Sequence, residues 1–418
     1  MASNHNPIIL KLANRIKKYK SIHSFFKKVY YYFCYLYSSN KSQRYEVLDG
    51  LSVQFPVDIQ RDYFFGYYHS SPWSYDDNFI AINSVINSKV LQINIIDLST
   101  SKLKVIDETT LWNFQQGAML GWFPGEHKVY YNKLIDGTYK TVLYDISNDR
   151  KDFFDLPIQI VHPSGKYYLS INYRSLFKIN KDYGYAEDCK FFSNQGVGIW
   201  KCFFDKSKKP ELIISKSDML KTPLPLDREN YNFEYNHCLF SDNGDYFLFI
   251  NRYKDGGNKC SKLILASTEH REFNLQVINK DFVSHMCWLD NENLFYFGDA
   301  KDDSIGYYIY NIKSSKSRKV MPENFNDGHP SASKNNDWVV LDSYPDSRCD
   351  SHLYLYNISS SKTISIGKFR TNVKYQEYYR CDLHPRWNNK GDKVMVDTLY
   401  ENKRASFILD LKEIVNDK

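Results

Sequence analysis

The chain repeats one pattern of apolar and polar positions at intervals of about forty to fifty residues, which is the spacing of β-propeller blades. Its clearest copy is NHCLFSDNGDYFLFI, in which the aromatic residue Phe240 precedes a polar turn and then an apolar strand that begins at Tyr246. With Phe240 as the reference, the equivalent positions hold Trp73, Trp122, Trp288, Ala332 and Trp387. A seventh copy, IVHPSGKYYLSI, matches less well because His162 falls in its turn.

Each copy is followed by further strand-like segments that end in polar turns, such as VLQINIIDLS, KTVLYDIS, HLYLYNIS and ASFILDLK. The 35 Tyr and 27 Phe residues also favour sheet over helix, because aromatic side chains fit a pleated and half-buried surface. The pattern therefore predicts an all-β fold, a seven-bladed β-propeller over residues 46–418.

Residues 1–45 have a different pattern. Apolar residues recur at helical spacing, as at Ile9, Leu12 and Ile16, and this stretch holds nine Lys and Arg residues and no acidic residue. This predicts an N-terminal basic amphipathic helical segment that makes peripheral contact with an anionic membrane. A helix packed on the propeller and a solvated arm are the alternatives.

The remainder of the chain is close to neutral, with 46 basic and 49 acidic residues from Glu46 onward. We expect no nucleic-acid partner, because phosphate neutralisation needs a basic face on the folded domain. The eight Cys residues form no CxxC pair, so neither a zinc knuckle nor a redox motif is indicated. The apolar stretch 29–37 is short and lacks the small-residue cleavage site of a signal peptide. This predicts a cytoplasmic protein, which residues 1–45 could hold at the inner face of the membrane.

Four consecutive copies of the repeat place a histidine three residues before the reference position, at His237, His285, His329 and His384. Equivalent positions of a propeller are related by rotation about its axis, so these imidazoles should surround one end of the central channel. Converging imidazoles are suitable ligands for a divalent metal ion such as zinc, manganese or calcium, and Asp327 and Asp382 are candidates to orient them. The alternative is that blade repeats copy a scaffold histidine that bonds neighbouring strands.

Several arginines accompany these histidines: Arg252 ends a strand of the fourth copy, and Arg380 and Arg386 flank His384 in RCDLHPRW. Because guanidinium groups bind carboxylates through two hydrogen bonds, they indicate an acidic ligand. Ion pairs with Asp327, Asp342 and Asp382 are the alternative role. The chain has no GxSxG, Gly-rich phosphate loop or HExxH motif, and its turn aspartates give no specific support to glycoside hydrolysis.

The stretches FGYYHSSPW, NFQQGAMLGWFPG, KDYGYAED, VSHMCW, NDGHPSASKNNDWVVLDSYPD and RCDLHPRW resemble those of propeller-type polysaccharide lyases. The similarity is to the ulvan lyases and, more distantly, to the oligogalacturonate lyases, and it covers roughly residues 60–412. It implies β-elimination on a uronate-containing polysaccharide or oligosaccharide.

The resemblance also implies roles for individual residues. His285, His329 and His384 match the positions that hold a divalent metal, His237 and Arg252 match the base and the group that neutralises the carboxylate, and Tyr185 is a candidate proton donor. Arg380, Arg386 and His69 are expected to contact the substrate, although His69 stands where these lyases tend to carry an acidic residue. A propeller that serves the biosynthesis of surface polysaccharide (capsule or O-antigen), with other chemistry or none, is the alternative function, and a protein-interaction propeller is a third.

The charge pattern of residues 1–45 yields a test of the membrane hypothesis. We expect the full chain to float with anionic liposomes, and a chain that starts at Tyr45 to stay in the soluble fraction. Added salt should weaken the interaction, because its electrostatic part is screened. Equal partitioning of the two chains would show that this segment has another purpose.

Overall fold

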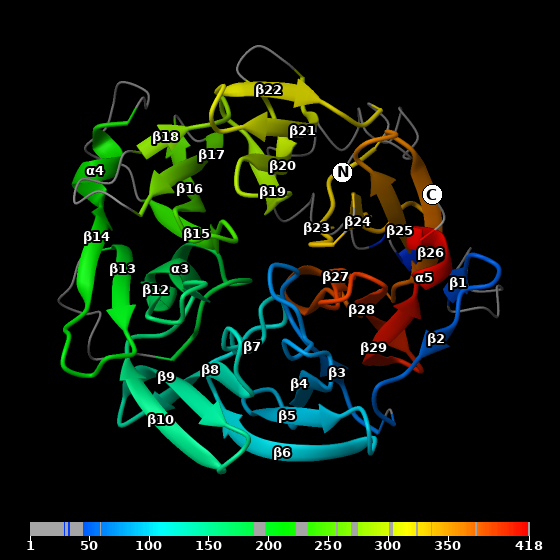
Figure 1. The fold of residues 1–418 in the computed structure, drawn as a ribbon, viewed down its shortest axis with the longest axis horizontal. Coiled ribbons are helices and arrows are strands. Elements are labelled where there is room, and N and C mark those ends of the chain that lie inside the picture. The colour runs from blue at the N-terminus through cyan, green and yellow to red at the C-terminus, as the bar shows by residue number, and fades with distance from the viewer. Residues whose placement is uncertain are drawn as a thin grey trace.

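The computed structural model describes residues 29, 32, 33 and 45–416, apart from gaps at 59, 188–196, 223–232, 256–257, 269–274, 301–303, 323–324, 336 and 373. The helical segment predicted over residues 1–45 thus lies almost wholly outside the described residues. From Tyr45 onward the chain forms seven antiparallel sheets that stand around a central axis (Figure 1). The predicted seven-bladed, all-β propeller is confirmed.

The first four blades take their strands in chain order from the channel outward. Blade 1 has β3 (Tyr63–Phe64), β4 (Phe79–Val85), β5 (Leu91–Asp97) and β6 (Lys102–Thr109); blade 2 has β7 (Gly121–Trp122), β8 (Lys128–Ile135), β9 (Thr138–Asp145) and β10 (Arg150–Asp155). Blade 3 has β11 (Ile160–Val161), β12 (Tyr167–Ile171), β13 (Gly198–Phe203) and β14 (Glu211–Ser215); blade 4 has β15 (Glu234–Phe240), β16 (Tyr246–Asp255), β17 (Asn258–Ser267) and β18 (Leu275–Val277).

The last three blades follow the same plan, but two of them borrow strands from the start of the chain. Blade 5 has β19 (Val283–Trp288), β20 (Asn293–Gly298), β21 (Gly306–Asn311) and β22 (Lys316–Lys319). Blade 6 has β23 (Pro330–Ala332), β24 (Trp338–Asp342), β25 (Asp350–Asn357), β26 (Thr363–Arg370) and, outermost, β1 (Tyr45–Val47). Blade 7 has β27 (Arg386–Trp387), β28 (Lys393–Tyr400), β29 (Lys403–Asp410) and, outermost, β2 (Val53–Gln54).

Short helices lie between these strands or after them: α3 (Tyr173–Ile179), α4 (Lys216–Leu220), η2 (Glu377–Tyr379) and α5 (Lys412–Asn416). None of the helices in the described part of the chain has the length and apolar content needed to cross a membrane.

The reference aromatics of the repeat join neighbouring blades. The indole nitrogen of Trp122 donates to the carbonyl of Pro72 (2.7 Å), that of Trp288 to Leu239 (3.1 Å) and that of Trp387 to Ser331 (2.9 Å). In each case the acceptor is the residue just before the reference position of the preceding blade. A buried indole needs such a partner, and this explains why Trp recurs at this point of the repeat.

Polar residues on the second strands make a further set of links between blades. The side chain of Asn132 exchanges two hydrogen bonds with the backbone of Ile158 (3.0 and 2.7 Å), and Asp342 accepts from the backbone N–H of His384 (3.0 Å). Asp397 accepts from the backbone N–H groups of Phe65 and Gly66, each at 3.2 Å. Each link runs from one blade to the innermost segment of the next.

The innermost strand of blade 1 is interrupted. Its pairing stops at Phe64 and resumes only at Trp73, which bridges to Ile80, and residues 65–72 between them form what we call the channel segment. The hydroxyl of Tyr68 donates to the carbonyl of Met286 (3.0 Å) and accepts from its N–H (3.1 Å), so the segment reaches blade 5. In Figure 1 it is the blue trace that enters the middle of the ring.

The closure of the ring by β1 and β2 generates a prediction. Tyr45, Val47, Leu51 and Val53 pack against the core shared by blades 6 and 7. A chain that starts at Phe55 should therefore lose about 3 to 5 kcal/mol of unfolding free energy, since each partly buried apolar side chain contributes about 1 kcal/mol. A chain that starts at Tyr45 keeps both strands and is the control. Urea denaturation of the two chains measures the difference, and equal midpoints would contradict this account of ring closure.

Candidate functional site

The position three residues before the reference aromatic is not a histidine in every blade. Blades 4 to 7 place His237, His285, His329 and His384 there, whereas the sequence gives Ser70, Met119 and Ile158 in blades 1 to 3. His237 and His384 have left-handed backbone conformations, with φ of 57° and 43°, and so has the equivalent Met119 of blade 2, with φ of 57°. This conformation therefore belongs to the repeat, and in His237 it coincides with a break of the β15–β16 register.

The structure gathers these four histidines, which we call the His cluster. The ring centroids of His285 and His329 are 4.1 Å apart, and those of His329 and His384 are 4.3 Å apart. The ring of Tyr67 connects this group to His237, because it stacks on His237 at 4.7 Å and meets His384 at 5.0 Å. All four imidazoles are buried.

Asp342 fixes two of these histidines. Its carboxylate accepts from Nδ1 of His329 (2.9 Å), from the backbone N–H of His329 (2.7 Å) and from the backbone N–H of His384 (3.0 Å). Burial alone would lower the pKa of His329, but Asp342 outweighs it and the pKa is raised. With Nδ1 as the donor, Nε2 of His329 turns its lone pair away from Asp342, and it has no protein partner.

His329, Asp382 and His384 form a group that could hold a metal ion. One ligand atom from each lies within 4.8 Å of the others, all three residues are buried, and Nε2 of both histidines lacks a hydrogen-bond partner. Two imidazole nitrogens and a carboxylate oxygen are a donor set that suits manganese or zinc. The residues present therefore fit the predicted divalent metal, although its identity stays a prediction.

His285, the third predicted metal ligand, lies beside this group and has its own carboxylate partner. Its Nδ1 bonds Asp327 at 2.8 Å. Burial and the neighbouring His329 lower its pKa more than Asp327 raises it. Asp382, predicted to orient the histidines, is therefore also a candidate ligand, and the part of His285 stays a prediction.

His237 has no carboxylate on its imidazole. Its Nε2 is 3.3 Å from the hydroxyl of Tyr67 and 3.3 Å from the amide nitrogen of Asn236, and its Nδ1 is buried without a partner. Burial, followed by the charge of Arg252, lowers its pKa well below 6.5. His237 is therefore neutral at physiological pH, and because the Asn236 amide donates to Nε2, that nitrogen keeps the lone pair that can accept a proton.

The three arginines have different surroundings. Arg386 is 1% exposed, and its guanidinium donates to the carbonyl of Gly66 and to Asp397 (2.6 Å), so it holds the base of the channel segment. Arg380 pairs with Asp382 (2.8 Å) and with Asp182. Arg252 lies near His237, and its Nη1 is buried with no partner. Arg386 also keeps a buried Nε and Nη1 without a partner, but its other nitrogen is held by Asp397 and Gly66. Of the three, Arg252 is the one whose charge acts on the candidate base His237.

The structure does not bring Tyr185 to the His cluster. Its ring stacks on Tyr173 at 4.5 Å, and its hydroxyl accepts from the amide of Asn132 (2.9 Å). The tyrosines that touch the cluster are instead Tyr67, Tyr68, Tyr183 and Tyr344. Sequence reasoning missed them as site residues, although Tyr67 and Tyr68 stand in FGYYHSSPW, a stretch that had marked the resemblance.

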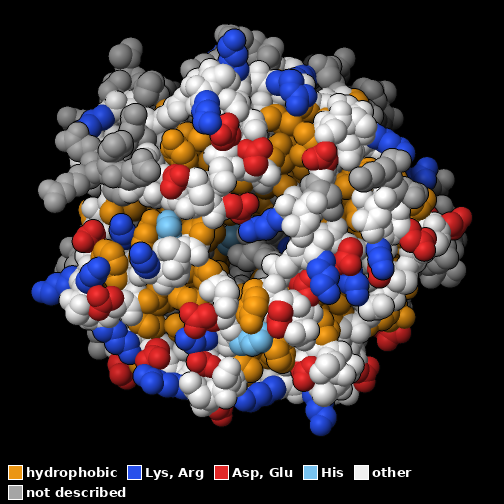
Figure 2. Space-filling view, in the orientation of Figure 1, with side chains coloured by type: hydrophobic (Ala, Val, Ile, Leu, Met, Phe, Trp, Pro, Cys, Tyr) orange, Lys and Arg blue, Asp and Glu red, His pale blue; other side chains and the backbone are white. Residues whose placement is uncertain are grey.

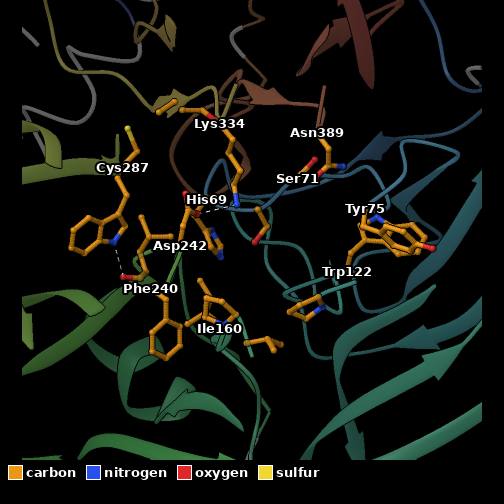
Figure 3. Close-up of a pocket in the computed structure, with 18 of the residues that line it drawn as sticks. His69, Ser71, Tyr75, Trp122, Ile160, Phe240, Asp242, Cys287, Lys334 and Asn389 are labelled. Atoms are coloured by element: carbon orange, nitrogen blue, oxygen red, sulfur yellow. Dashed lines mark hydrogen bonds and ion pairs between the residues drawn. The ribbon is translucent and has the colours of Figure 1, made fainter. Parts of the chain in front are cut away.

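His69 lies in the channel segment two residues after Tyr67, and the centroids of these two rings are 5.4 Å apart. It also lines a cavity of about 490 Å³ among the turns that follow the innermost strands (Figure 3). Figure 2 shows a hollow at the centre of this side of the molecule, with acidic and basic side chains interspersed around it. Burial, followed by the charge of Arg386, lowers the pKa of His69 to about 4. Tyr68 lines the same cavity while its ring meets His329 at 5.4 Å, so the channel segment separates this cavity from the His cluster.

No protein family matches the chain, and no curated protein matches it by sequence. Among solved structures, an oligogalacturonate lyase in complex with manganese is similar, with a TM-score of 0.65 and 12% identity over 89% of this chain and 97% of that one. An oligogalacturonate lyase from Vibrio parahaemolyticus has a TM-score of 0.63 and 13% identity over 89% and 98% of the two chains. A puromycin-hydrolysing peptidase from Mycobacterium tuberculosis has a TM-score of 0.52 and 8% identity over 86% and 54%.

At these identities the similarity shows the fold alone. The predicted likeness to oligogalacturonate lyases is confirmed at that level, and the likeness to ulvan lyases stays a prediction. The peptidase shares the propeller as well, so a function has to be argued from the site and not from the architecture.

The metal group yields a prediction. We expect one divalent ion to remain per chain after dialysis, measured by elemental analysis, and His329→Ala or His384→Ala to remove it. Asp342→Asn should weaken binding by about ten- to a hundredfold, because the carboxylate sets the tautomer and basicity of His329. Binding should also weaken as the pH falls through the pKa of His329, which is raised above 6.5, because a proton then competes with the ion for this imidazole. The control is His162→Ala, since His162 bonds Ser164 and Gly244 in a turn. A protein that is free of metal and indifferent to added manganese, zinc and calcium would contradict the assignment.

Proposed function

We propose that this protein acts on a uronate-containing glycan and cleaves it by β-elimination. The observation that carries the proposal is the pairing of a neutral, buried His237 with Arg252, both of which have a nitrogen without a protein partner. A base beside an unpaired guanidinium suits a substrate whose acidic C–H lies next to a carboxylate. The oligogalacturonate lyases that share this fold support the choice of substrate class.

The chemistry follows from these two side chains. His237 takes the proton from the carbon next to the uronate carboxylate, and Arg252 neutralises the carboxylate, so that the negative charge which builds up on it is stabilised as it forms. The electron pair of the broken C–H bond forms a double bond in the sugar ring. The bond to the leaving glycan oxygen breaks, and that oxygen must gain a proton.

Tyr67 is the candidate donor of that proton, in place of Tyr185. Its hydroxyl lies 3.3 Å from His237, and burial, followed by the neighbouring Tyr68, raises its pKa well above 10, so it stays protonated. A divalent ion held by His329, His384 and Asp382 would act as a Lewis acid on the substrate carboxylate. Asp342 and the channel segment orient these groups, and burial of the cluster keeps water away from the reacting atoms.

The proposal predicts cleavage of an acidic glycan. Elimination leaves an unsaturated sugar that absorbs ultraviolet light, so a screen of uronate polysaccharides, with carboxyl-reduced chains as controls, reports on the reaction directly. His237→Ala should abolish the signal, and Arg252→Ala should reduce kcat/KM by about a hundred- to a thousandfold, since it removes one contact that stabilises developing charge. His162→Ala, outside the cluster, should leave activity unchanged.

The pKa of His237 sets the expected pH profile. Because this pKa is lowered, the imidazole stays neutral until the solution is more acidic than pH 6.5, and the acidic limb of kcat/KM should lie below that value. The absence of product with every uronate glycan, together with binding that His237→Ala and Arg252→Ala leave unaltered, would contradict the lyase and favour the role in polysaccharide biosynthesis.

A further inference from the structure

Residues 113–117 form a loop before the innermost strand of blade 2 that packs with the aromatic residues of η2 and lies against Gly66, so that together they form a wall beside the channel segment. We infer that Gln116 in this loop and Tyr379 in η2 bind the sugar unit next to the uronate that the His cluster holds. The protein then recognises an oligosaccharide and not a single sugar. This inference rests on the proposed function and deepens it, because it names the part of the substrate that this wall contacts.

The loop borders the site through its backbone and through Gln115. A Cβ atom on Gly66 would lie 2.8 Å from the carbonyl carbon and oxygen of Gln116, so the loop lies against the residue that precedes Tyr67. The amide of Gln115 donates to the backbone carbonyl of Arg380 (3.2 Å), and Arg380 is the ion-pair partner of Asp382 in the candidate metal group. The loop therefore contacts two elements that reach the His cluster.

The amide of Gln116 is unpaired. This side chain is 2% exposed, and neither its Nε2 nor its Oε1 has a hydrogen-bond partner. The backbone around it is tied down, because Asn113 and Gly117 exchange two backbone hydrogen bonds and Oδ1 of Asn113 accepts from the N–H of Gln116 (2.8 Å). Nδ2 of Asn113 and Oε1 of Gln115 are also buried without a partner, but Gln116 is the residue of this loop in which both polar atoms of the side chain are unpaired. A buried polar group without a partner costs about 1 to 3 kcal/mol, so each such group in a folded protein needs an explanation.

A sugar hydroxyl explains this amide. A carboxamide offers one acceptor and two donor hydrogens and carries no charge, which matches neutral hydroxyls that both donate and accept. The carboxylate of a uronate would leave the acceptor unpaired, and Arg252 already serves it. Since the amide is enclosed in the free protein, binding has to open this wall locally.

The aromatic residues beside the loop supply the other half of a sugar site. Phe114 meets Tyr378 and Tyr379 with ring centroids 5.6 and 5.4 Å apart, and the guanidinium of Arg404 lies 4.3 Å over Phe114. Arg404 also donates to the carbonyl of Tyr379 (2.5 Å), so this one side chain holds both Phe114 and Tyr379 in place. The side chain of Tyr379 is nevertheless 56% exposed. A fixed, amphipathic ring of this kind can cover the apolar face of a sugar while its hydroxyl stays in water.

The test uses free galacturonic acid and its linear hexamer, with binding measured by calorimetry in a His237→Ala background so that no substrate is consumed. We expect Gln116→Leu and Tyr379→Ala each to lower the affinity for the hexamer by about tenfold, which is the upper range for one net hydrogen bond. Tyr379→Phe should keep most of the affinity. Neither change should affect the binding of free galacturonate, which is too short to reach this wall.

Stability separates a ligand-binding role of Gln116 from a structural one. Gln116→Leu removes a buried group that has no partner, so its unfolding midpoint should be unchanged or higher. Gln115→Leu is the matched control, because it breaks the bond to Arg380 and should lower the midpoint.

Tyr75→Ala is the control for the affinity change in Tyr379→Ala. Tyr75 is also an exposed tyrosine, at 48%, but it lines the cavity at the other end of the channel.

The outcomes are distinct. If the His237→Ala protein binds neither a galacturonate oligomer nor any other glycan of the uronate screen, the proposed substrate class is wrong. If it binds the hexamer and the Gln116→Leu and Tyr379→Ala variants bind it equally well, the proposed function stands and this site is refuted. A loss of stability in Gln116→Leu as large as that in Gln115→Leu would also overturn the role given to Gln116.

Discussion

The buried carboxylate of Asp342 is the interaction on which the arrangement of the site depends. It lies at the end of β24, is 1% exposed, and accepts from the backbone of His329 in its own blade and from the backbone of His384 in the next. A Cβ atom on Gly328 would lie 1.8 Å from the carbonyl oxygen of Asp342, so only glycine allows the two segments to approach this closely. This single side chain thus links two blades and fixes the imidazole of His329 together with its tautomer, and its loss would leave three buried donors unpaired.

This carboxylate occupies a place that the scaffold uses elsewhere for purely structural links. Asn132 bonds the innermost segment of blade 3 from blade 2, and Asp397 bonds the channel segment of blade 1 from blade 7. In blade 6 the same kind of link carries a charge and also meets an imidazole. A position that closes the ring in other blades therefore orients a candidate metal ligand in this one, which is how a repeated scaffold can acquire a site without a change of fold.

Sequence periodicity was sufficient for the fold because its signal is local. The reference Trp residues recur at the spacing of the blades, and Trp122, Trp288 and Trp387 each bond the preceding blade. The phase of His285, His329 and His384 was visible for the same reason. The channel segment was not, because Tyr67 and Tyr68 depart from the repeat and cross to other blades, and no local pattern encodes such a crossing. The sequence also could not predict that Arg386 is held by a carboxylate whereas Arg252 is not. This difference depends on whether a buried carboxylate such as Asp397 faces the guanidinium.

The four histidines differ in their surroundings because of one position of the repeat. This position lies two residues before the histidine of the following blade. Blade 6 places Asp327 there, which bonds His285, and blade 7 places Asp382, which lies in a group with His329 and His384. Blade 5 places the apolar Val283 at this position, so His237 gains no carboxylate from its neighbour and faces Arg252 and Tyr67 instead. Carboxylate neighbours favour a cation among His285, His329 and His384, whereas their absence keeps His237 neutral and able to accept a proton. One ring of equivalent positions thus holds a candidate metal group and a candidate base, because the blades differ at a single neighbouring position.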